Sequence, residues 1–240
     1  MRVSRWTLES EMTPQETAFL LALLAAERLT GRYLEIGTAA GGTLWKMMRV
    51  FPNEHRPRFV VVDPMTYFPE QLQTVHRNLR EHDLDPDHVD IRTTDSARAL
   101  QLSRAYGERF DFILIDGNHA HLSVMRDLRW TLLLNVGGIV CLHDYEKRFP
   151  GVSHALDAFL SRHADRYTRI GQSGSLVALR KIRDLESRRV FGILHWVSAS
   201  LRHVRTALTG KVRWLGRHIA KRVWKRIGRM PENYGRKPRA

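Results

Sequence analysis

The sequence has one cysteine, Cys141, among its 240 residues, and it has no long apolar run. A single thiol excludes an intramolecular disulfide framework and a cysteine-based zinc site. The two most apolar segments, residues 18–26 and 190–197, fall far short of the roughly 18 apolar residues that a membrane-spanning helix needs. Glu9 and Glu11 follow the basic amino terminus, and no cleavage site follows an apolar core. We therefore expect a cytoplasmic protein without a spanning segment.

Acidic residues are scarce in the last quarter of the chain. Residues 183–240 hold 16 Lys and Arg against three Asp and Glu, whereas the whole chain holds 39 against 25. The first 182 residues are therefore nearly neutral, and the net charge of +14 belongs almost entirely to the extension. A composition of 43% hydrophobic and 27% charged residues excludes disorder throughout. The charge distribution predicts a globular domain, residues 1–182, followed by a basic extension, residues 183–240.

Short apolar segments alternate with segments of helical length in the first 182 residues. The expected strands lack polar alternation, which is typical of strands buried on both faces of a parallel sheet. Thr13, Pro14 and Glu16 have the spacing of a helix start. The expected strands are residues 33–36, 59–62, 89–92, 112–115 and 139–142, and the expected helices are 14–29, 43–51, 69–82, 96–106 and 123–134.

Two further expected strands, residues 167–170 and 176–179, are joined by a segment too short for a crossover helix. They should therefore pair as an antiparallel hairpin. The predicted fold class is α/β: a doubly wound, Rossmann-like sheet of seven strands with a terminal antiparallel hairpin, followed by a basic helical C-terminal extension.

Three groups of residues follow the first three expected strands, at the edge where open parallel sheets bind ligands. Residues 35–42 (EIGTAAGG) form a glycine-rich turn that leads into a helix. Asp63 follows the second strand, where an acid accepts ribose hydroxyls. Asp95 and Ser96 follow the third strand, where a side chain can reach an adenine. Taken singly, the acids could be solvated turn residues, and Asp95 with Ser96 could be a helix cap.

Together these groups resemble the methyl-donor site of class I S-adenosylmethionine (SAM) methyltransferases, over about residues 31–180. The terminal hairpin is also the strand order of that class. The resemblance implies SAM as the cofactor. It implies that the following residues bind it: Glu35, Gly37, Thr38, Gly41, Asp63, Asp95 and Ser96.

The fourth and fifth expected strands are followed by residues 116–121 (DGNHAH) and 142–145 (LHDY). Asp116 and Asp144 should project into one crevice, where two carboxylates repel unless a cation or a shared proton intervenes. A hard divalent cation such as Mg²⁺ would resolve this repulsion, and His143 could add a nitrogen ligand. His119 lies on the same loop as Asp116 and is the candidate general base for a substrate hydroxyl.

This pattern resembles the metal-dependent O-methyltransferase group that includes macrocin O-methyltransferase and the cephalosporin-biosynthesis methyltransferase-like proteins. The resemblance implies that Asp116 binds Mg²⁺ and that His119 is the base. An acidic pair completes the metal site in that group, whereas this chain has His143 and Asp144. The alternative for this pair is a structural or substrate-hydrogen-bonding role.

The basic extension has apolar residues at helical spacing, but Arg205, Arg226 and two glycines interrupt the pattern. Three interpretations remain open: a segment that binds an anionic membrane surface, a nucleic-acid-binding segment, and a helix packed on the domain or on a partner subunit. We do not expect nucleic acid as the partner, because the body of the protein is nearly neutral. Membrane binding would place the enzyme at the inner face of the membrane. A homo-oligomer is a further partner to consider.

The predicted function is transfer of a methyl group from SAM to a hydroxyl of a small molecule or glycan, with a divalent cation. One alternative is a nicotinamide-dependent oxidoreductase, against which the lack of a G-x-G-x-x-G motif and the terminal hairpin argue. The other is an RNA-binding or RNA-modifying protein recruited by the basic extension.

Overall fold

The computed structural model describes residues 10–27 and 29–184. The predicted basic helical extension lies outside these ranges, except for its first two residues. Within them, no helix is long and apolar enough to cross a membrane.

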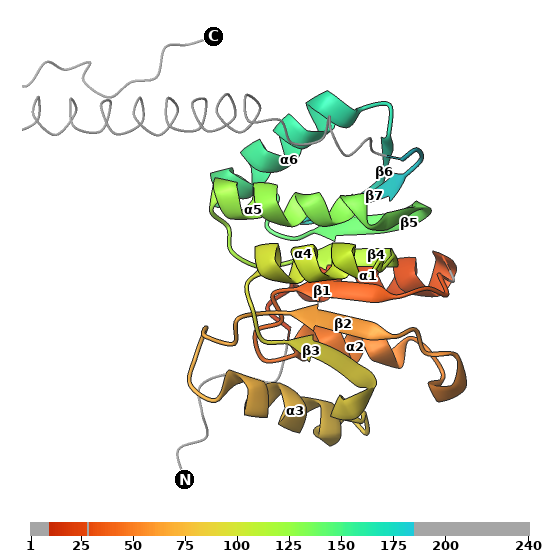
Figure 1. Cartoon of the computed structure of the whole chain (residues 1–240), viewed down its shortest axis with the longest axis vertical. Helices are drawn as coiled ribbons and strands as arrows, with labels where there is room; N and C mark the ends of the chain where they lie inside the picture. The colour runs from red at the N-terminus through yellow and green to blue at the C-terminus, as the bar shows by residue number, and fades with distance from the viewer. Residues whose placement is uncertain (1–9, 28, 185–240) are drawn as a thin grey trace, which may run out of the picture. The chain divides into compact units, whose positions relative to one another are not determined.

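One sheet of seven strands, in the order β3-β2-β1-β4-β5-β7-β6, forms the centre of the domain (Figure 1). Neighbouring strands from β3 to β5 run parallel, whereas β7 is antiparallel to both β5 and β6. The predicted fold class and terminal hairpin are therefore confirmed. The strands are β1 (Tyr33–Ile36), β2 (Phe59–Val62), β3 (Val89–Arg92), β4 (Phe110–Ile115), β5 (Leu134–Leu142), β6 (Tyr167–Ser173) and β7 (Leu176–Lys181).

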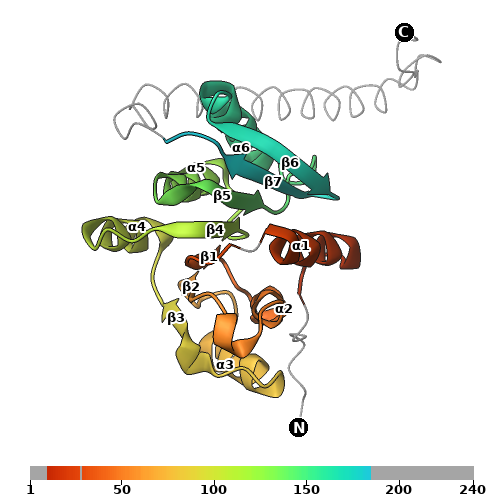
Figure 2. The same ribbon diagram turned by 90° about the vertical axis from the view of Figure 1, so that its right-hand side faces the viewer.

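Helices cover both faces of the sheet, as Figure 2 shows. One layer contains α1 (Pro14–Glu27), α2 (Gly42–Arg49) and α3 (Gln71–Glu81). The other contains α4 (Ser96–Ala105), α5 (His121–Asp127) and α6 (Pro150–His163). Three short 3₁₀ helices, Asn53–His55, Pro86–His88 and Leu128–Leu132, complete the described part. The central strands β1, β2 and β4 are buried on both faces over nearly their whole length, which explains why apolar residues predominate in them.

Two parts of the expected secondary structure are wrong. Residues 123–134 do not form one helix, because α5 ends at Asp127, a 3₁₀ turn follows, and Leu134 already begins β5. Helix α6 was not predicted, although Pro150 stands at its first turn and apolar side chains recur along its buried face. The sequence 145–149 before it contains four polar or charged residues, and these hid the helix start.

Candidate active site

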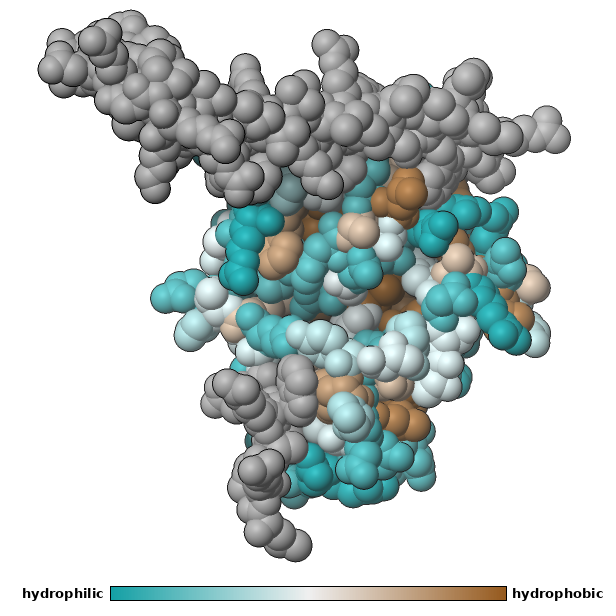
Figure 3. Space-filling view, turned by 90° about the vertical axis from the view of Figure 1, so that its left-hand side faces the viewer, coloured by the Kyte–Doolittle hydropathy of each residue, from teal (hydrophilic) through white to brown (hydrophobic). Residues whose placement is uncertain are grey.

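The carboxyl ends of the parallel strands open into one cavity of about 1310 Å³. The loop from β3 to α4 lies at the left of Figure 1, and Figure 3 shows the molecule from that side, where hydrophilic side chains surround smaller hydrophobic patches. The cavity has two halves. We call the half at the ends of β1 to β3 the cofactor half, and the half at the ends of β4 and β5 the catalytic half.

The glycine turn after β1 brings two backbone segments into close contact. Gly37 has a φ of 81°, and a Cβ added there would lie 2.3 Å from the carbonyl oxygen of Asp116. A larger residue would push the turn away from the loop that follows β4. Ala39 stands where glycine-rich turns of the G-x-G type have their second glycine, and it also has a positive φ, of 45°. The turn is therefore strained at one residue and free of side chains where it meets the catalytic half.

Asp63 lies at the end of β2 and lines the cavity beside Gly37. Its Oδ2 accepts a hydrogen bond from the backbone nitrogen of Thr38 at 3.0 Å, and its Oδ1 accepts one from the backbone nitrogen of Met65 at 2.7 Å. The carboxylate thus holds the glycine turn and faces the cavity with its remaining lone pairs. This position agrees with the one predicted for the ribose acid.

Three of the predicted cofactor-binding residues, Glu35, Thr38 and Gly41, do not line the cavity. Glu35 is buried in β1, and burial raises the pKa of its carboxyl to about 8 against a lowering by the Thr38 hydroxyl. Gly41 precedes α2 with a φ of 82°. Glu35 lies in β1, and Thr38 and Gly41 belong to the turn itself, so these three residues shape the turn, and their contact with the cofactor stays a prediction.

Asp95 and Ser96 both line the cavity after β3. The Asp95 carboxylate caps α4 by accepting a hydrogen bond from the backbone nitrogen of Arg98 at 3.0 Å, so the helix-cap interpretation applies to this residue. The Ser96 hydroxyl accepts a hydrogen bond from Trp130 Nε1 at 2.9 Å. It also hydrogen-bonds Asp127, an acid of α5 that the sequence analysis missed. Burial raises the pKa of the Asp127 carboxyl to about 7.

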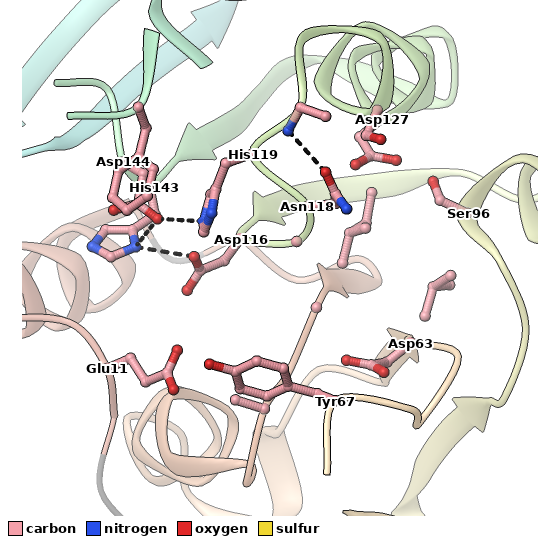
Figure 4. A pocket seen from close by; sticks show the side chains of 18 of the residues that line it. Glu11, Asp63, Tyr67, Ser96, Asp116, Asn118, His119, Asp127, His143 and Asp144 are labelled. Atoms are coloured by element: carbon pink, nitrogen blue, oxygen red, sulfur yellow. Dashed lines mark hydrogen bonds and ion pairs between the residues drawn. The ribbon is translucent and has the colours of Figure 1, made fainter. Parts of the chain in front are cut away.

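In the catalytic half, His119 and Asp144 form a pair, as Figure 4 shows. His119 Nε2 lies 2.7 Å from Asp144 Oδ2, although the two residues follow different strands. The hydrogen bond with Asp144 raises the pKa of His119 and outweighs the opposing effect of burial. The ring packs on Phe149, with 4.3 Å between ring centroids, and its side chain is 42% exposed. His119 is therefore oriented by a carboxylate and accessible from the cavity.

His143 lies between the two aspartates that were predicted to converge. Its Nδ1 lies 3.0 Å from Asp116 Oδ1 and 3.4 Å from Asp144 Oδ2. Burial opposes protonation of the ring, but the hydrogen bonds with both carboxylates prevail and raise its pKa to about 11. Asp144 is held in the left-handed region with a φ of 60°, a strained conformation for a residue with a Cβ. The protonated ring neutralises the repulsion between the aspartates.

Glu16 is a second site residue that the sequence analysis assigned only to the start of α1. It does cap the helix, because its Oε2 accepts hydrogen bonds from the nitrogen and hydroxyl of Thr13 at 2.9 and 2.8 Å. The same carboxylate lies 3.4 Å from His143 Nε2, and its Oε1 accepts hydrogen bonds from the nitrogen and hydroxyl of Ser175, both at 2.7 Å. Burial would raise the pKa of Glu16, but these hydrogen bonds lower it to about 2.

The donor set in the catalytic half fits a divalent cation. Asp116, His143 and Asp144 each offer one ligand atom, and these atoms all lie within 4.8 Å of one another. Carboxylate oxygens and an imidazole nitrogen are both ligands of divalent cations, and the second ring nitrogen faces a carboxylate, as it does in most metal-bound histidines.

Four further residues near these loops and strands have other surroundings. Cys141 is fully buried in β5, as its apolar surroundings predict. His121 is 4% exposed and does not line the cavity, so it is neither a solvent-facing nor a cavity histidine. The Tyr145 hydroxyl donates a hydrogen bond to Asp157 Oδ1 at 2.8 Å, away from the cavity lining, whereas Phe149 lines it.

Comparison with known proteins identifies the class of this fold. Residues 34–145 match a protein family described as "Methyltransferase domain". This segment runs from β1 to the residue after Asp144, so it includes both halves of the cavity. The predicted resemblance to class I SAM-dependent methyltransferases is confirmed, and so is the predicted enzyme class. No curated protein matches the chain.

Solved O-methyltransferase structures share the fold at low sequence identity. An O-methyltransferase from Bacillus cereus in complex with S-adenosylhomocysteine (SAH) is 21% identical, with a TM-score of 0.55, over 71% of this chain and 83% of that one. TomG from Streptomyces achromogenes, solved with SAM, is 18% identical, with a TM-score of 0.54, over 72% and 82%. CalS11, a TDP-rhamnose 3′-O-methyltransferase of calicheamicin biosynthesis, is 16% identical, with a TM-score of 0.56, over 68% and 77%.

Proposed function

We propose that this protein transfers the methyl group of SAM to a hydroxyl of a small molecule or glycan. The observation that carries the proposal is the His119–Asp144 pair, which adjoins the cofactor half of the same cavity. The acceptor oxygen attacks the sulfonium methyl carbon, the carbon–sulfur bond breaks, and SAH leaves with the bonding electron pair. The hydroxyl proton goes to His119.

In the cofactor half, Asp63 accepts hydrogen bonds from the ribose hydroxyls, and Gly37 lets the backbone approach the cofactor closely. Asp95 and Ser96 lie where the adenine ring binds. Glu35 in β1, and Thr38 and Gly41 within the turn, hold the shape of the turn. Positioning of the two reactants supplies much of the rate acceleration in such a transfer.

In the catalytic half, Asp144 accepts the Nε2 proton of His119 and so orients the ring. The other ring nitrogen of His119 is then the atom that takes the hydroxyl proton. Asp116, His143 and Asp144 hold a divalent cation, for which the sequence alone favours Mg²⁺. When bound, a cation there lowers the pKa of the acceptor hydroxyl and orients it.

A sugar or polyol hydroxyl is the acceptor that we favour over a phenol. CalS11, which shares the fold, is described as acting on TDP-rhamnose, and the cavity presents mostly polar and charged side chains around His119. Tyr67 and Phe149 are the phenyl-bearing side chains among the described lining residues, and Phe149 already packs against the His119 ring. A phenol would have little aromatic surface to stack on, whereas hydroxyls would find hydrogen-bond partners.

Thermal stability measured with SAH and with NAD tests the cofactor assignment. SAH should raise the melting temperature of the full chain, because a ligand that binds only the folded state stabilises it by mass action. NAD at the same concentration should have little effect. A shift with NAD alone would support the oxidoreductase alternative instead.

We also propose that residues 183–240 bind an anionic membrane surface and place the enzyme at the inner face of the membrane. The support is that this segment holds 16 basic residues against three acidic ones, and that the basic residues are interleaved with apolar residues and tryptophans. Such a location would make a glycolipid or a lipid-linked glycan a natural acceptor. The body, residues 1–182, would carry the catalysis.

Vesicle binding tests this role of the extension. The full chain should bind vesicles of anionic lipid and dissociate as the salt concentration rises, while neutral vesicles should bind it much less. A chain shortened after Asp184 should bind SAH but not vesicles. Asp184 is kept because its Oδ1 lies 3.0 Å from the buried Lys181 Nζ. Loss of SAH binding on shortening would show that the extension stabilises the domain instead.

A further inference from the structure

The cation site of the proposed function contains a nitrogen donor at its centre. His143 Nδ1 faces both Asp116 Oδ1 and Asp144 Oδ2, at 3.0 and 3.4 Å. Ligands of one small divalent cation that subtend a right angle lie about 3 Å apart, so these two separations suit a shared cation. Mg²⁺ prefers oxygen ligands and keeps several waters, whereas imidazole suits the divalent cations of the first transition row.

The ring of His143 is held in this orientation from its far side. The side chain is 8% exposed, and Nε2 lies 3.4 Å from Glu16 Oε2. A carboxylate on the second nitrogen fixes the tautomer in which Nδ1 carries a lone pair toward the cation, and it strengthens that nitrogen as a ligand. Glu16 and His143 are 127 positions apart, so this contact depends on the packing of α1 against the end of the sheet.

Glu16 is itself fixed by the protein. Hydrogen bonds from Thr13 and Ser175 engage both of its oxygens, and its side chain is 4% exposed. The hairpin approaches so closely that a Cβ added at Gly174 would lie 2.6 Å from Glu16 Oε1. Neither the carboxylate nor the ring can turn away without breaking several contacts.

We propose that this site selects a divalent cation of the first transition row over Mg²⁺, with His143 Nδ1 as a ligand and Glu16 as the carboxylate that orients His143. The inference rests on the proposed function, because it concerns the cation of that same catalytic half. Glu16 is a positioning residue, since it acts on the site only through His143. Binding of the cation displaces the Nδ1 proton of the ring.

Calorimetric titration of the full, metal-free chain with Co²⁺, Mn²⁺ and Mg²⁺ tests the selectivity without measuring turnover. Co²⁺ and Mn²⁺ should bind at least about tenfold more tightly than Mg²⁺. The visible absorption of bound Co²⁺ reports the ligands directly and should change in His143→Asp. In that variant, which has only oxygen donors, the preference for Co²⁺ over Mg²⁺ should shrink or reverse.

Glu16→Gln tests the positioning role, and it should weaken Co²⁺ binding by about 10- to 100-fold. Glu27→Gln is the matched control, because Glu27 lies on the same helix as Glu16 but pairs with Arg180. It should leave Co²⁺ affinity within about twofold. Equal weakening by both substitutions would overturn the role of Glu16.

Equal affinity of the wild-type chain for Mg²⁺ and Co²⁺, or no binding of any cation, would overturn the selectivity without the use of a variant. SAH titration of the same sample separates this failure from failure of the proposed function. If SAH binds and no cation does, the imidazolium of His143 fills the place of a cation. This inference and the cation of the proposed function are then wrong, whereas the assignment of methyl transfer from SAM stands. If SAH does not bind, the methyltransferase assignment of the site is wrong.

Discussion

The two halves of the cavity are built in different ways. In the cofactor half, Asp63 and Asp95 follow their own strands closely, and both carboxylates accept hydrogen bonds from backbone nitrogens, Asp63 from Thr38 and Met65 and Asp95 from Arg98. In the catalytic half, carboxylates and imidazoles alternate along a chain from Glu16 through His143 and Asp144 to His119. The first half depends on the course of the backbone, and the second on side-chain contacts between distant segments. A substitution in the cofactor half should therefore affect mainly the turn that the residue contacts. A substitution in the catalytic half should also change the orientation or pKa of the neighbouring side chains.

The largest effect is expected in the catalytic half, from His119→Ala. Loss of the general base should lower turnover by about 10²–10⁴-fold, while SAH affinity remains unchanged because His119 does not lie in the cofactor half. Single-turnover methyl transfer and SAH calorimetry would measure the two quantities. His88→Ala is the control, since His88 is exposed in a 3₁₀ turn away from the cavity. A parallel loss of SAH binding in His119→Ala would mean that the two halves are not separable.

In the cofactor half, Asp63→Ala should weaken SAM and SAH binding by about 1.5–3 kcal/mol, the contribution of hydrogen bonds to a charged group. The backbone donors of Thr38 and Met65 would also lose their partner, so the turn itself should loosen. Calorimetry with SAH measures the change. Asp63→Asn should lose less, because its amide oxygen still accepts one hydrogen bond. Unchanged affinity in Asp63→Ala would remove this residue from the site.

Stability should fall as the pH rises, because of Asp127 beneath the cofactor half. Burial raises the pKa of its carboxyl from 3.8 to about 7. Above about pH 4 the unfolded chain loses this proton, while the folded chain retains it up to about pH 7. The free energy of unfolding therefore falls as the pH rises through this range. Asp127→Asn should therefore remove up to about 3 kcal/mol of the difference in unfolding free energy between pH 5 and pH 8.

Urea unfolding at several pH values would test this prediction for Asp127. Asp87→Asn, at an exposed position, is the control and should leave the pH dependence unchanged. Glu35, whose pKa burial raises to about 8, contributes in the same direction, so some pH dependence should remain in Asp127→Asn. Identical pH profiles for the wild type and Asp127→Asn would contradict the raised pKa.

The smallest effect is expected from Ala39→Gly in the glycine turn. Ala39 has a φ of 45°, and glycine adopts this conformation without the penalty that a Cβ brings. The gain is offset by the greater freedom of glycine in the unfolded chain, so unfolding free energy should rise by less than about 1 kcal/mol. Chemical denaturation measures it. A loss of stability would show that the alanine methyl group contributes packing that outweighs the strain.

The sequence alone was sufficient for the parallel part of the sheet. The bounds of β1, β2 and β3 are those predicted, since short segments rich in β-branched and aromatic residues are delimited by turn residues. Because residues that follow parallel strands meet at one edge, the sequence also predicted that Asp63, Asp95 and Asp116 would line one cavity. His143 was predicted as a possible nitrogen ligand of the cation, but not as a group that contacts both aspartates itself.

Only the tertiary structure decided the contacts between distant segments. Glu16 has the sequence signature of a helix cap, and no local pattern indicates that its second function is to contact His143, 127 positions away. Asp127 looks like an ordinary helix acid until packing buries it beside Ser96. Glu35 has the sequence position of a cofactor ligand, but in the fold it is buried in β1 and does not line the cavity. Local sequence determines where strands and turns form, whereas burial and long-range pairing arise only when these elements pack together, and they set the charge and orientation of the catalytic groups.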